Sequence, residues 1–220
     1  MTGLNHVRPG GPPLVVRLSA SVTMTKFSVG PMDNNAYLLQ STGGASVLVD
    51  AANDSGRLLK LIGNEPLDTI VTTHRHGDHW QGLAAVAEAT GARLIGGRPD
   101  VDAIADGANV PELVGFWDGD QVELGEESLA VIGLVGHTPG SITLAYSGGG
   151  PVHLFTGDSL FPRGPGRTRN PQDFTSLMDD LEAKIFGRFD DEAVVHPGHG
   201  DDTTLGVERP HLAEWRQRGW

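Results

Sequence analysis

The 220-residue sequence contains no cysteine, so neither a disulfide bond nor a thiolate metal ligand is available to it. It also lacks an apolar run of about 18 residues, the length that indicates a membrane-spanning helix. Residues 1–13 lack the hydrophobic centre of a secretory signal peptide. We therefore expect a cytoplasmic protein with no membrane partner, although a secreted protein can lack cysteine too.

Basic residues are scarce. The chain has 16 Lys and Arg against 28 Asp and Glu, which gives a formal net charge of −12. A general nucleic-acid binder needs a basic face to neutralise phosphates, so we expect no nucleic-acid partner. The sequence leaves the oligomeric state open.

Six consecutive residues, His74-Arg75-His76-Gly77-Asp78-His79, bring together three imidazoles and a carboxylate. If they were only packing residues, each buried ring would need its own hydrogen-bond partner. A bound metal accounts for all four side chains at once, and this donor set suits zinc, iron or manganese. The alternative is a polar turn in which Asp78 caps the N-terminus of a helix.

This cluster lies between two predicted elements. Residues 69–73 are mostly β-branched and predict a short buried strand, and residues 80–89 predict a helix. On extended backbone His74 and His76 point the same way, whereas the adjacent Asp78 and His79 diverge. The pattern therefore allows a second ion beside the first.

Three later apolar runs each end in a glycine and a candidate ligand. They cover residues 129–137, 152–158 and 193–199, and they end at His137, Asp158 and His199. Glycine near the end of a strand lets the backbone turn and approach a site closely. Because open sheets place their sites at the carboxyl ends of strands, we expect these three side chains to join the first four.

Taken together, the motifs resemble the metallo-β-lactamase superfamily. They are His74-x-His76-x-Asp78-His79, His137-Thr138-Pro139-Gly140-Ser141, Gly157-Asp158 and Pro197-Gly198-His199-Gly200, and the match spans about residues 28 to 206. The resemblance implies an α/β fold, a four-layer αββα sandwich of two mixed sheets flanked by helices. It places the site at one edge of the two sheets. The lack of cysteine separates the chain from the β-lactamases that use a cysteine ligand.

The resemblance also implies a two-metal site in which a metal-bridging hydroxide attacks the substrate. It assigns His74, His76 and His137 to one divalent ion, Asp78, His79 and His199 to the other, and Asp158 to both. Two dications lower the pKa of a shared water, so hydroxide forms without a side-chain base. Asp158 and Asp78 are the expected catalytic carboxylates, since the first would set the ion spacing and the second would orient the hydroxide. We expect zinc, although iron and manganese take the same donors.

An arginine-rich segment follows Asp158. It includes Phe161, and its three arginines, Arg163, Arg167 and Arg169, lie within seven residues. In an acidic chain, such a segment beside a metal centre predicts an anionic substrate group held by charge-assisted hydrogen bonds. We take these four residues as candidates for substrate binding. The alternative is a solvated loop with its arginines in water.

Within the superfamily, residues 155–167 resemble the glyoxalase II branch, the hydroxyacylglutathione hydrolases. The resemblance implies a metallo-hydrolase acting on a small anionic thioester such as an S-2-hydroxyacyl-thiol, with Arg167 contacting the thiol part. Arg169 stands where that branch has an aromatic residue, so the thiol is either glutathione or another small thiol. Residues 164–168 also resemble the iron-dependent persulfide dioxygenases, which is the main alternative function. A lactonase of the same fold is a further alternative.

The domain prediction is a flexible N-terminal arm over residues 1–20, rich in proline and glycine, and a single domain over residues 21–220. Folded sequence is expected to begin near Leu14 or Val22. The role of the arm is open.

Other segments predict the frame of the domain. We expect a hairpin of residues 27–40 and 46–51, helices over residues 55–62, 99–106, 171–185 and 210–220, and an irregular connection over residues 111–119. Asn170 is the expected N-cap of the third helix. Asp50 is expected either to support a metal-bound histidine or to cap a turn. Four other residues are expected to be packed rather than to bind metal or cover the site: Phe116, Trp117, His153 and His196.

Overall fold

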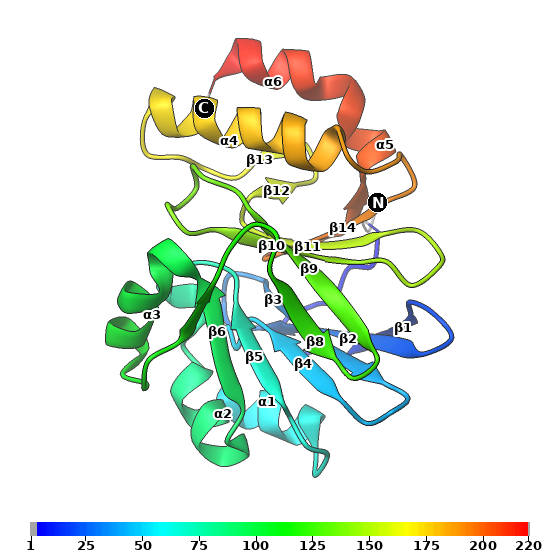
Figure 1. The fold of residues 1–220 in the computed structure, drawn as a ribbon, viewed down its shortest axis with the longest axis vertical. Helices are drawn as coiled ribbons and strands as arrows, with labels where there is room; N and C mark the ends of the chain where they lie inside the picture. The colour runs from blue at the N-terminus through cyan, green and yellow to red at the C-terminus, as the bar shows by residue number, and fades with distance from the viewer. Residues whose placement is uncertain (1–3, 220) are drawn as a thin grey trace.

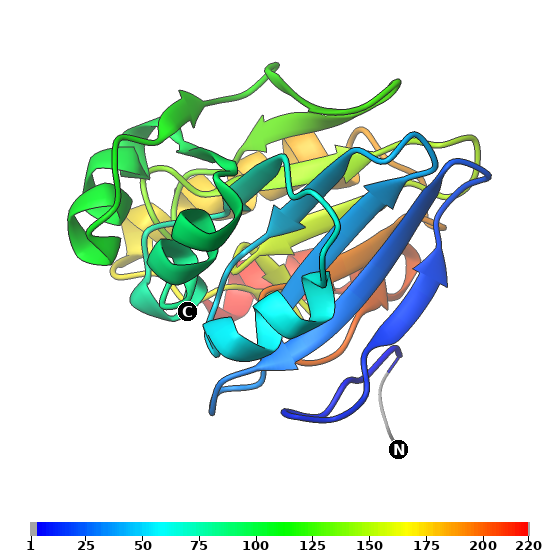
Figure 2. The ribbon, with the colours of Figure 1, turned by 90° about the horizontal axis from the view of Figure 1, so that it is seen from below.

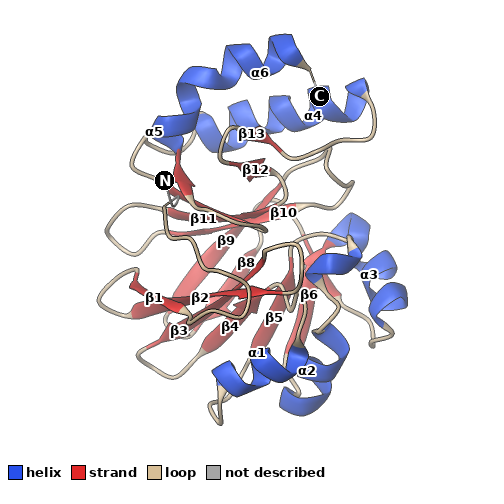
Figure 3. Ribbon diagram, turned by 180° about the vertical axis from the view of Figure 1, so that it is seen from behind, coloured by secondary structure: helices blue, strands red, loops and turns tan. Residues whose placement is uncertain are grey.

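The computed structural model describes residues 4–219 and places two β-sheets face to face between two layers of helices (Figure 1, Figure 3). The first sheet has seven strands in chain order: β1 (Leu14–Arg17), β2 (Val22–Val29), β3 (Asn34–Ser41), β4 (Ser46–Val49), β5 (Thr69–Thr72), β6 (Arg93–Gly97) and β7 (Val114–Phe116). Strands β1 to β4 pair antiparallel, and β4 to β7 pair parallel.

The second sheet has six strands in the order β15-β14-β11-β10-β9-β8. They are β8 (Gln121–Leu124), β9 (Glu127–Gly133), β10 (Ile142–Tyr146), β11 (His153–Gly157), β14 (Val194–Pro197) and β15 (Thr203–Thr204). Only β11 and β14 pair parallel. A two-stranded ribbon, β12 (Leu160–Phe161) with β13 (Gly164–Pro165), stands beside this sheet. Both sheets are therefore mixed, as predicted.

Helices cover the outer face of each sheet. Beside the first sheet lie α1 (Ser55–Ile62), α2 (Leu83–Thr90) and α3 (Val101–Ala108), and beside the second lie α4 (Pro171–Asp180), α5 (Leu205–Glu208) and α6 (Leu212–Arg218). Figure 2 shows α1 in front of the first sheet, with the second sheet behind. The predicted four-layer αββα sandwich is confirmed.

Three apolar clusters hold these layers together. One lies between the sheets and includes Leu39, Leu144 and Phe155. Another joins the first sheet to α1, α2 and α3, and a third joins the second sheet to α4 and α6. Burial of this surface is the main driving force for a four-layer fold, because each sheet must cover both of its faces.

The predicted hairpin is only partly correct. Strands β3 and β4 do form an antiparallel hairpin, but residues 27–40 are two strands rather than one. The chain reverses at residues 30–33, where Gly30 and Asp33 have φ of 77° and 58°. These left-handed conformations, which favour Gly and Asp, make a turn inside what the apolar pattern presented as one continuous strand.

The sheet begins earlier than residue 21. Strand β1 pairs with β2, with Leu14 opposite Lys26, and it lies inside the segment that the sequence analysis assigned to an arm. Strand β1 starts at Leu14, which is one of the two expected starting points. Val7 is also buried, at 3% exposure. The flexibility of residues 1–20 stays a prediction.

The predicted helices are found with small shifts. Helix α1 has its predicted bounds, and Asn170 caps α4 by accepting a hydrogen bond from the backbone N–H of Asp173. A π-helical segment, η3 (Leu181–Phe186), extends α4 to cover the predicted range. Three 3-10 turns complete the helical segments: η1 (Gly77–His79), η2 (Arg98–Asp100) and η4 (Arg209–His211).

The connection predicted over residues 111–119 contains β7, so it is less irregular than expected. Phe116 and Trp117 pack against the cluster between the sheets, which confirms that they are core residues. None of the helices described in residues 4–219 is long and apolar enough to cross a membrane.

Candidate metal centre

The two sheets meet at one edge, where several strands end. The backbone N–H of Ile142 in the second sheet donates to the carbonyl oxygen of Thr73, just after β5, at 2.9 Å. The N–H of Asn35 in β3 donates to the carbonyl oxygen of Gly198, just after β14, at 2.7 Å. The N–H of Gly198 in turn donates to the carbonyl oxygen of Gly157, at the end of β11, at 2.8 Å. The ends of β5, β11 and β14 therefore lie at this edge, and each is followed by predicted site residues.

Two glycines let the backbone come this close. A Cβ atom on Gly198 would lie 2.4 Å from Oδ1 of Asp158 and 2.6 Å from the ring of His79. Gly157 has a φ of 49°, and a Cβ there would lie 2.5 Å from the hydroxyl of Thr73. Any side chain at these two positions would collide with the site, which agrees with the predicted role of glycine at the strand ends.

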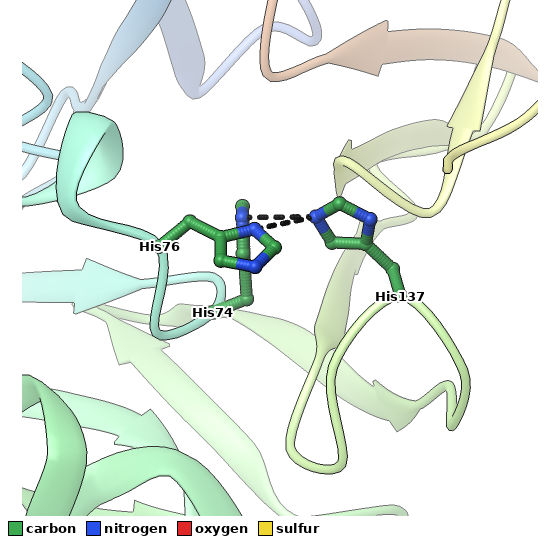
Figure 4. Close-up of side chains that lie close together, drawn as sticks. All are labelled: His74, His76 and His137. Carbon is green, nitrogen blue, oxygen red and sulfur yellow. Dashed lines mark hydrogen bonds between the residues drawn. The ribbon is translucent and has the colours of Figure 1, made fainter. Parts of the chain in front are cut away.

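His74, His76 and His137 form what we call the first group (Figure 4). His74 and His76 come from the turn after β5, and His137 faces them from the loop after β9. Nε2 of His137 lies 2.9 Å from Nδ1 of His76 and 3.2 Å from Nε2 of His74. Nitrogens around a tetrahedral zinc ion stand about 3.3 Å apart, so the spacing suits one shared cation.

The hydrogen bonds behind these rings assign their tautomers. Nδ1 of His137 lies 2.6 Å from the carbonyl oxygen of Arg167, which can only accept, so Nδ1 carries the proton. The Thr73 hydroxyl donates to Asp50, so it accepts from Nδ1 of His74. The facing Nε2 atoms of both histidines are therefore bare lone pairs in the neutral rings. Two such atoms at 3.2 Å repel each other unless a cation lies between them.

The pKa values of the first group favour neutral rings. Burial lowers the pKa of His74 well below its usual range, and the nearby imidazole of His79 lowers it further. Burial and His137 lower the pKa of His76. Burial also lowers the pKa of His137, although Asp158 opposes the shift. Neutral imidazole is the form that binds metals.

Asp78, His79 and His199 form the second group. Nδ1 of His79 donates to Oδ2 of Asp50 at 2.9 Å, and Nδ1 of His199 donates to the carbonyl oxygen of Met32 at 2.9 Å. Their Nε2 atoms point inward: that of His199 lies 3.2 Å from Oδ2 of Asp78. Nε2 of His79 is buried and has no hydrogen-bond partner among residues 4–219. A buried ring nitrogen without a partner suits a metal ligand.

Charge reverses the pKa shifts in the second group. Burial acts to lower the pKa of His79, but Asp158 and Asp50 together raise it well above its usual range. His199 is buried too, yet its hydrogen bonds to Asp158 and Asp78 raise its pKa to about 10. The hydrogen bond from His199 lowers the pKa of Asp78 to about 2.

Asp158 lies between the two groups. Its Oδ1 is 3.4 Å from Nε2 of His79, and its Oδ2 is 3.6 Å from Nε2 of His137 and 3.5 Å from Nε2 of His199. Burial acts to raise the pKa of Asp158, but His79 and His199 hold it well below the usual range. Oδ1 has no hydrogen-bond partner among residues 4–219, which suits a metal ligand too. The structure thus brings all seven predicted ligands together, and their binding of metal stays a prediction.

Asp50 takes one of its two expected roles. Its side chain accepts hydrogen bonds from Nδ1 of His79 and from the backbone and hydroxyl of Thr73. It therefore supports a histidine of the site and orients its ring. Nδ1 of His153 and Nε2 of His196 form a hydrogen bond with each other, at 2.9 Å. Neither histidine belongs to the first or the second group, so neither is a candidate ligand.

The sequence analysis missed several residues that support the site. Asn34 donates through Nδ2 to the backbone and side-chain oxygens of Asp78, at 2.9 and 3.0 Å. Lys26 donates through Nζ to the carbonyl oxygen of Gly200 and to Oδ1 of Asp202, each at 2.7 Å. The two adjacent asparagines at positions 34 and 35, at the start of a strand, could have indicated side chains that support the site. The alternating pattern around Lys26 offered none.

The arginine-rich segment lies beside the first group. One cavity of about 400 Å³ is lined by His76, His137, Arg167, Thr168 and Arg169. An adjoining cavity of about 500 Å³ is lined by residues that include His137, Asp158, Phe161, Arg163 and Arg167. All three arginines are exposed. Larger hollows of about 650 and 670 Å³ lie elsewhere and contain none of the predicted site residues, so size alone does not mark the site.

Comparison with known proteins agrees with this geometry. The family model described as "Metallo-beta-lactamase superfamily" matches residues 29–199. A protein of Anaeromyxobacter dehalogenans named hydroxyacylglutathione hydrolase is 38% identical over 76% of this chain and 61% of its own length. A protein of the same name from Cereibacter sphaeroides is 37% identical over 61% of this chain and 51% of its own length. The chain thus spans about half to three fifths of these relatives.

Two solved structures are similar over most of the chain. The crystal structure of ETHE1 from Myxococcus xanthus has a TM-score of 0.74 and 25% identity, covering 88% of this chain and 84% of that one. The crystal structure of TTHA1623 in a di-iron-bound form has a TM-score of 0.70 and 28% identity, covering 84% of this chain and 96% of that one.

Proposed function

The chain belongs to the metallo-β-lactamase superfamily, and from this premise we propose that it is a dinuclear metal-dependent hydrolase of a small anionic thioester. The observation that carries the proposal is the convergence of five inward-facing ring nitrogens and two carboxylates beside an arginine-lined cavity. The similarity to relatives named hydroxyacylglutathione hydrolase supports the thioester as the substrate class.

The proposed ligand set fills two sites. His74, His76 and His137 would hold one ion, the second group would hold the other, and Asp158 would contact both. Two bound divalent cations supply a water of lowered pKa and a Lewis acid for the carbonyl oxygen. Zinc suits these donors, and iron is a second candidate because a similar structure carries two iron ions.

The protein's own residues would orient the reactants. Asp78 is held by Asn34 and stays ionised near neutral pH, since its pKa is about 2. Its carboxylate can accept a hydrogen bond from the attacking water and direct it. Cleavage adds water to the acyl carbon and releases the acid and a thiol. The thiolate is a good leaving group, so the site needs no strong general acid.

Arg167, Arg169 and Arg163 would bind the anionic thiol part of the substrate. They project from a loop that is tied to the site, because the carbonyl oxygen of Arg167 accepts the hydrogen bond from His137. Phe161 lies beside His199, with ring centroids 6.3 Å apart, and would contact the acyl group. Forked guanidinium groups suit carboxylates, which small thiol cofactors commonly carry.

Replacing Arg167 tests this assignment. Arg167→Ala should raise the KM for an anionic thioester about tenfold or more, because a charged hydrogen bond contributes roughly 1.5–3 kcal/mol. The KM for a neutral thioester should change little. Arg188→Ala is the matched control, since Arg188 is an exposed arginine that lines a different cavity. An equal rise for both substrates would remove the proposed role of Arg167.

The same protein preparation can test the reaction class. Thioester cleavage that stops on chelation and returns with added zinc or iron would support the hydrolase. One bound iron per chain, with oxygen uptake on a persulfide and no thioester cleavage, would replace it with the dioxygenase. Cleavage of lactones in preference to thioesters would favour the lactonase.

A further inference from the structure

Asp100 is a fully buried carboxylate that takes no part in either metal group. It ends η2, directly after strand β6 of the first sheet, and its exposure is 0%. Burying a charged carboxylate is costly unless several donors satisfy it. The donors that satisfy Asp100 therefore indicate what the residue does.

Four atoms approach the Asp100 carboxylate. Oδ2 accepts from the backbone N–H of Arg75 at 3.1 Å and from the hydroxyl of Thr138 at 2.5 Å. Oδ1 accepts from the backbone N–H of Gly140 at 3.1 Å. The side-chain Nε of Arg75 lies 3.8 Å from Oδ1. One carboxylate thus contacts two loops that are more than 60 residues apart in the sequence.

These two loops carry the three histidines of the first group. Arg75 stands between His74 and His76, and Thr138 directly follows His137. The first loop follows β5 in the first sheet, and the second follows β9 in the other sheet. Asp100 is therefore a direct link between the two sheets at the point where the first group forms. No donor of Asp100 lies in the second group.

We propose that Asp100 is a positioning residue that sets the spacing between His137 and the pair His74 and His76, and so the metal affinity of the first group. This inference rests on the proposed two-metal site. Such outer hydrogen-bond partners typically change metal affinity by 10–100-fold when they are replaced.

The geometry requires a carboxylate at this position. Asparagine would offer one acceptor oxygen, and its amide group would face either the N–H of Gly140 or the two donors on the other side. One loop would then lose its hydrogen bonds. The packing is also tight, since a Cβ atom on Gly140 would lie 2.6 Å from the backbone nitrogen of Asp100. Little room is left for the loop to settle elsewhere.

The test measures zinc affinity in two backgrounds, each with one group disabled. His199→Ala disables the second group and leaves the first, and His76→Ala does the reverse. Zinc affinity is measured at pH 7.5 by competition with a chelator. Adding Asp100→Asn should weaken zinc binding at least tenfold in the His199→Ala background. In the His76→Ala background it should change binding less than twofold.

A second pair of variants separates positioning from simple loss of stability. Thr138→Val keeps the shape but removes the hydroxyl, and Thr138→Ser keeps the hydroxyl. In the His199→Ala background, valine should weaken zinc binding severalfold and serine should restore it. If Asp100→Asn fails to fold, this pair decides the question alone.

The outcomes distinguish the inference from the function it rests on. Equal weakening of both groups by Asp100→Asn, or equal zinc affinity in the valine and serine variants, would overturn the positioning role and leave the metal site intact. A native chain that binds no ion would overturn the proposed function and this role with it.

Discussion

Both groups of the candidate metal centre contain a fully buried histidine, yet the pKa values of these two histidines shift in opposite directions. His74 and His79 are both fully buried. Burial dominates in the first group, and the pKa of His74 falls well below its usual range. Asp158 and Asp50 outweigh burial in the second, and the pKa of His79 rises well above it. The position of carboxylates, rather than burial, decides which imidazoles hold a proton in the absence of metal.

The buried contacts that hold the ligand loops of the two groups in place also differ. Asp100 ties the first group together through two backbone N–H groups and a hydroxyl, with Arg75 at a longer distance. The turn that carries His199 is tied by the ion pair of Lys26 and Asp202, whose side chains are both 0% exposed. The support of the second group is therefore a buried ion pair, whereas the buried carboxylate that supports the first group is satisfied mainly by neutral donors.

Removing Asp158 should have the largest effect, because it is the residue that the two groups share. Asp158→Ala should lower kcat/KM for a thioester about 1000-fold, corresponding to the loss of roughly 4 kcal/mol of transition-state stabilisation. It should also weaken metal binding by both groups. Asp78→Ala, measured in parallel, should weaken the second group alone. Two tightly bound ions and full activity in Asp158→Ala would show that the groups do not share this residue.

Breaking the buried ion pair should cost more stability than removing a single hydrogen bond to a buried carboxylate. Lys26→Met leaves Asp202 without its cation and should lower the free energy of unfolding by roughly 3–5 kcal/mol. Thr138→Val removes one hydrogen bond to the Asp100 carboxylate and should cost roughly 1.5–3 kcal/mol. Urea unfolding of the metal-free proteins measures both values, and Lys26→Met with Asp202→Asn should recover part of the loss. A cost below 1 kcal/mol for Lys26→Met would contradict the difference between the supports.

Metal binding by the two groups should depend differently on pH. His199 has its pKa raised to about 10, so it holds a proton at pH 7 that the metal must displace. Zinc affinity of the second group should fall about tenfold per pH unit for each displaced proton between pH 8 and pH 6. The first group, already neutral, should change little in that range. Calorimetry of zinc binding by the His76→Ala and His199→Ala variants, in buffers of different ionisation enthalpy, counts the protons that each group releases. Equal proton release by the two variants would contradict the predicted difference in pH dependence.

The smallest effect concerns His153, a histidine outside both groups. Burial and the neighbouring His196 together lower its pKa to about 4. The folded state then binds fewer protons than the unfolded state, whose histidine titrates near 6.5. The contribution of His153 to the free energy of unfolding is therefore fully present above pH 6.5, and it is lost as the pH falls toward 4. His153→Gln should flatten this part of the stability curve, and an unchanged curve would exclude His153 as its source.

The sequence predicted what is carried by local pattern. The strand-to-helix turn around residues 74–79 follows from an apolar run and turn residues that lie next to each other. The layers of the sandwich were predicted from the resemblance to the metallo-β-lactamase superfamily. The seven candidate ligands were recognised because each stands in a short motif at a strand end. The turn at residues 30–33 was missed because two strands of similar composition surround it.

The supporting residues could not be predicted, because their partners are distant in the sequence. Lys26 lies in an alternating strand where a lysine normally faces water, and it is buried only because Asp202 meets it from the far end of the chain. Asp100 follows Pro99 near a helix start and has the pattern of an ordinary cap. Its contact with both metal loops depends on how the two sheets pack, which no local pattern encodes.

The most direct test of the two-group account is the metal content of the purified chain by mass spectrometry, after loading with zinc, iron or manganese and removal of free ions. We predict two ions per chain in the native protein and one in each of His76→Ala and His199→Ala. A native chain that binds at most one ion with each of the three metals would contradict the account.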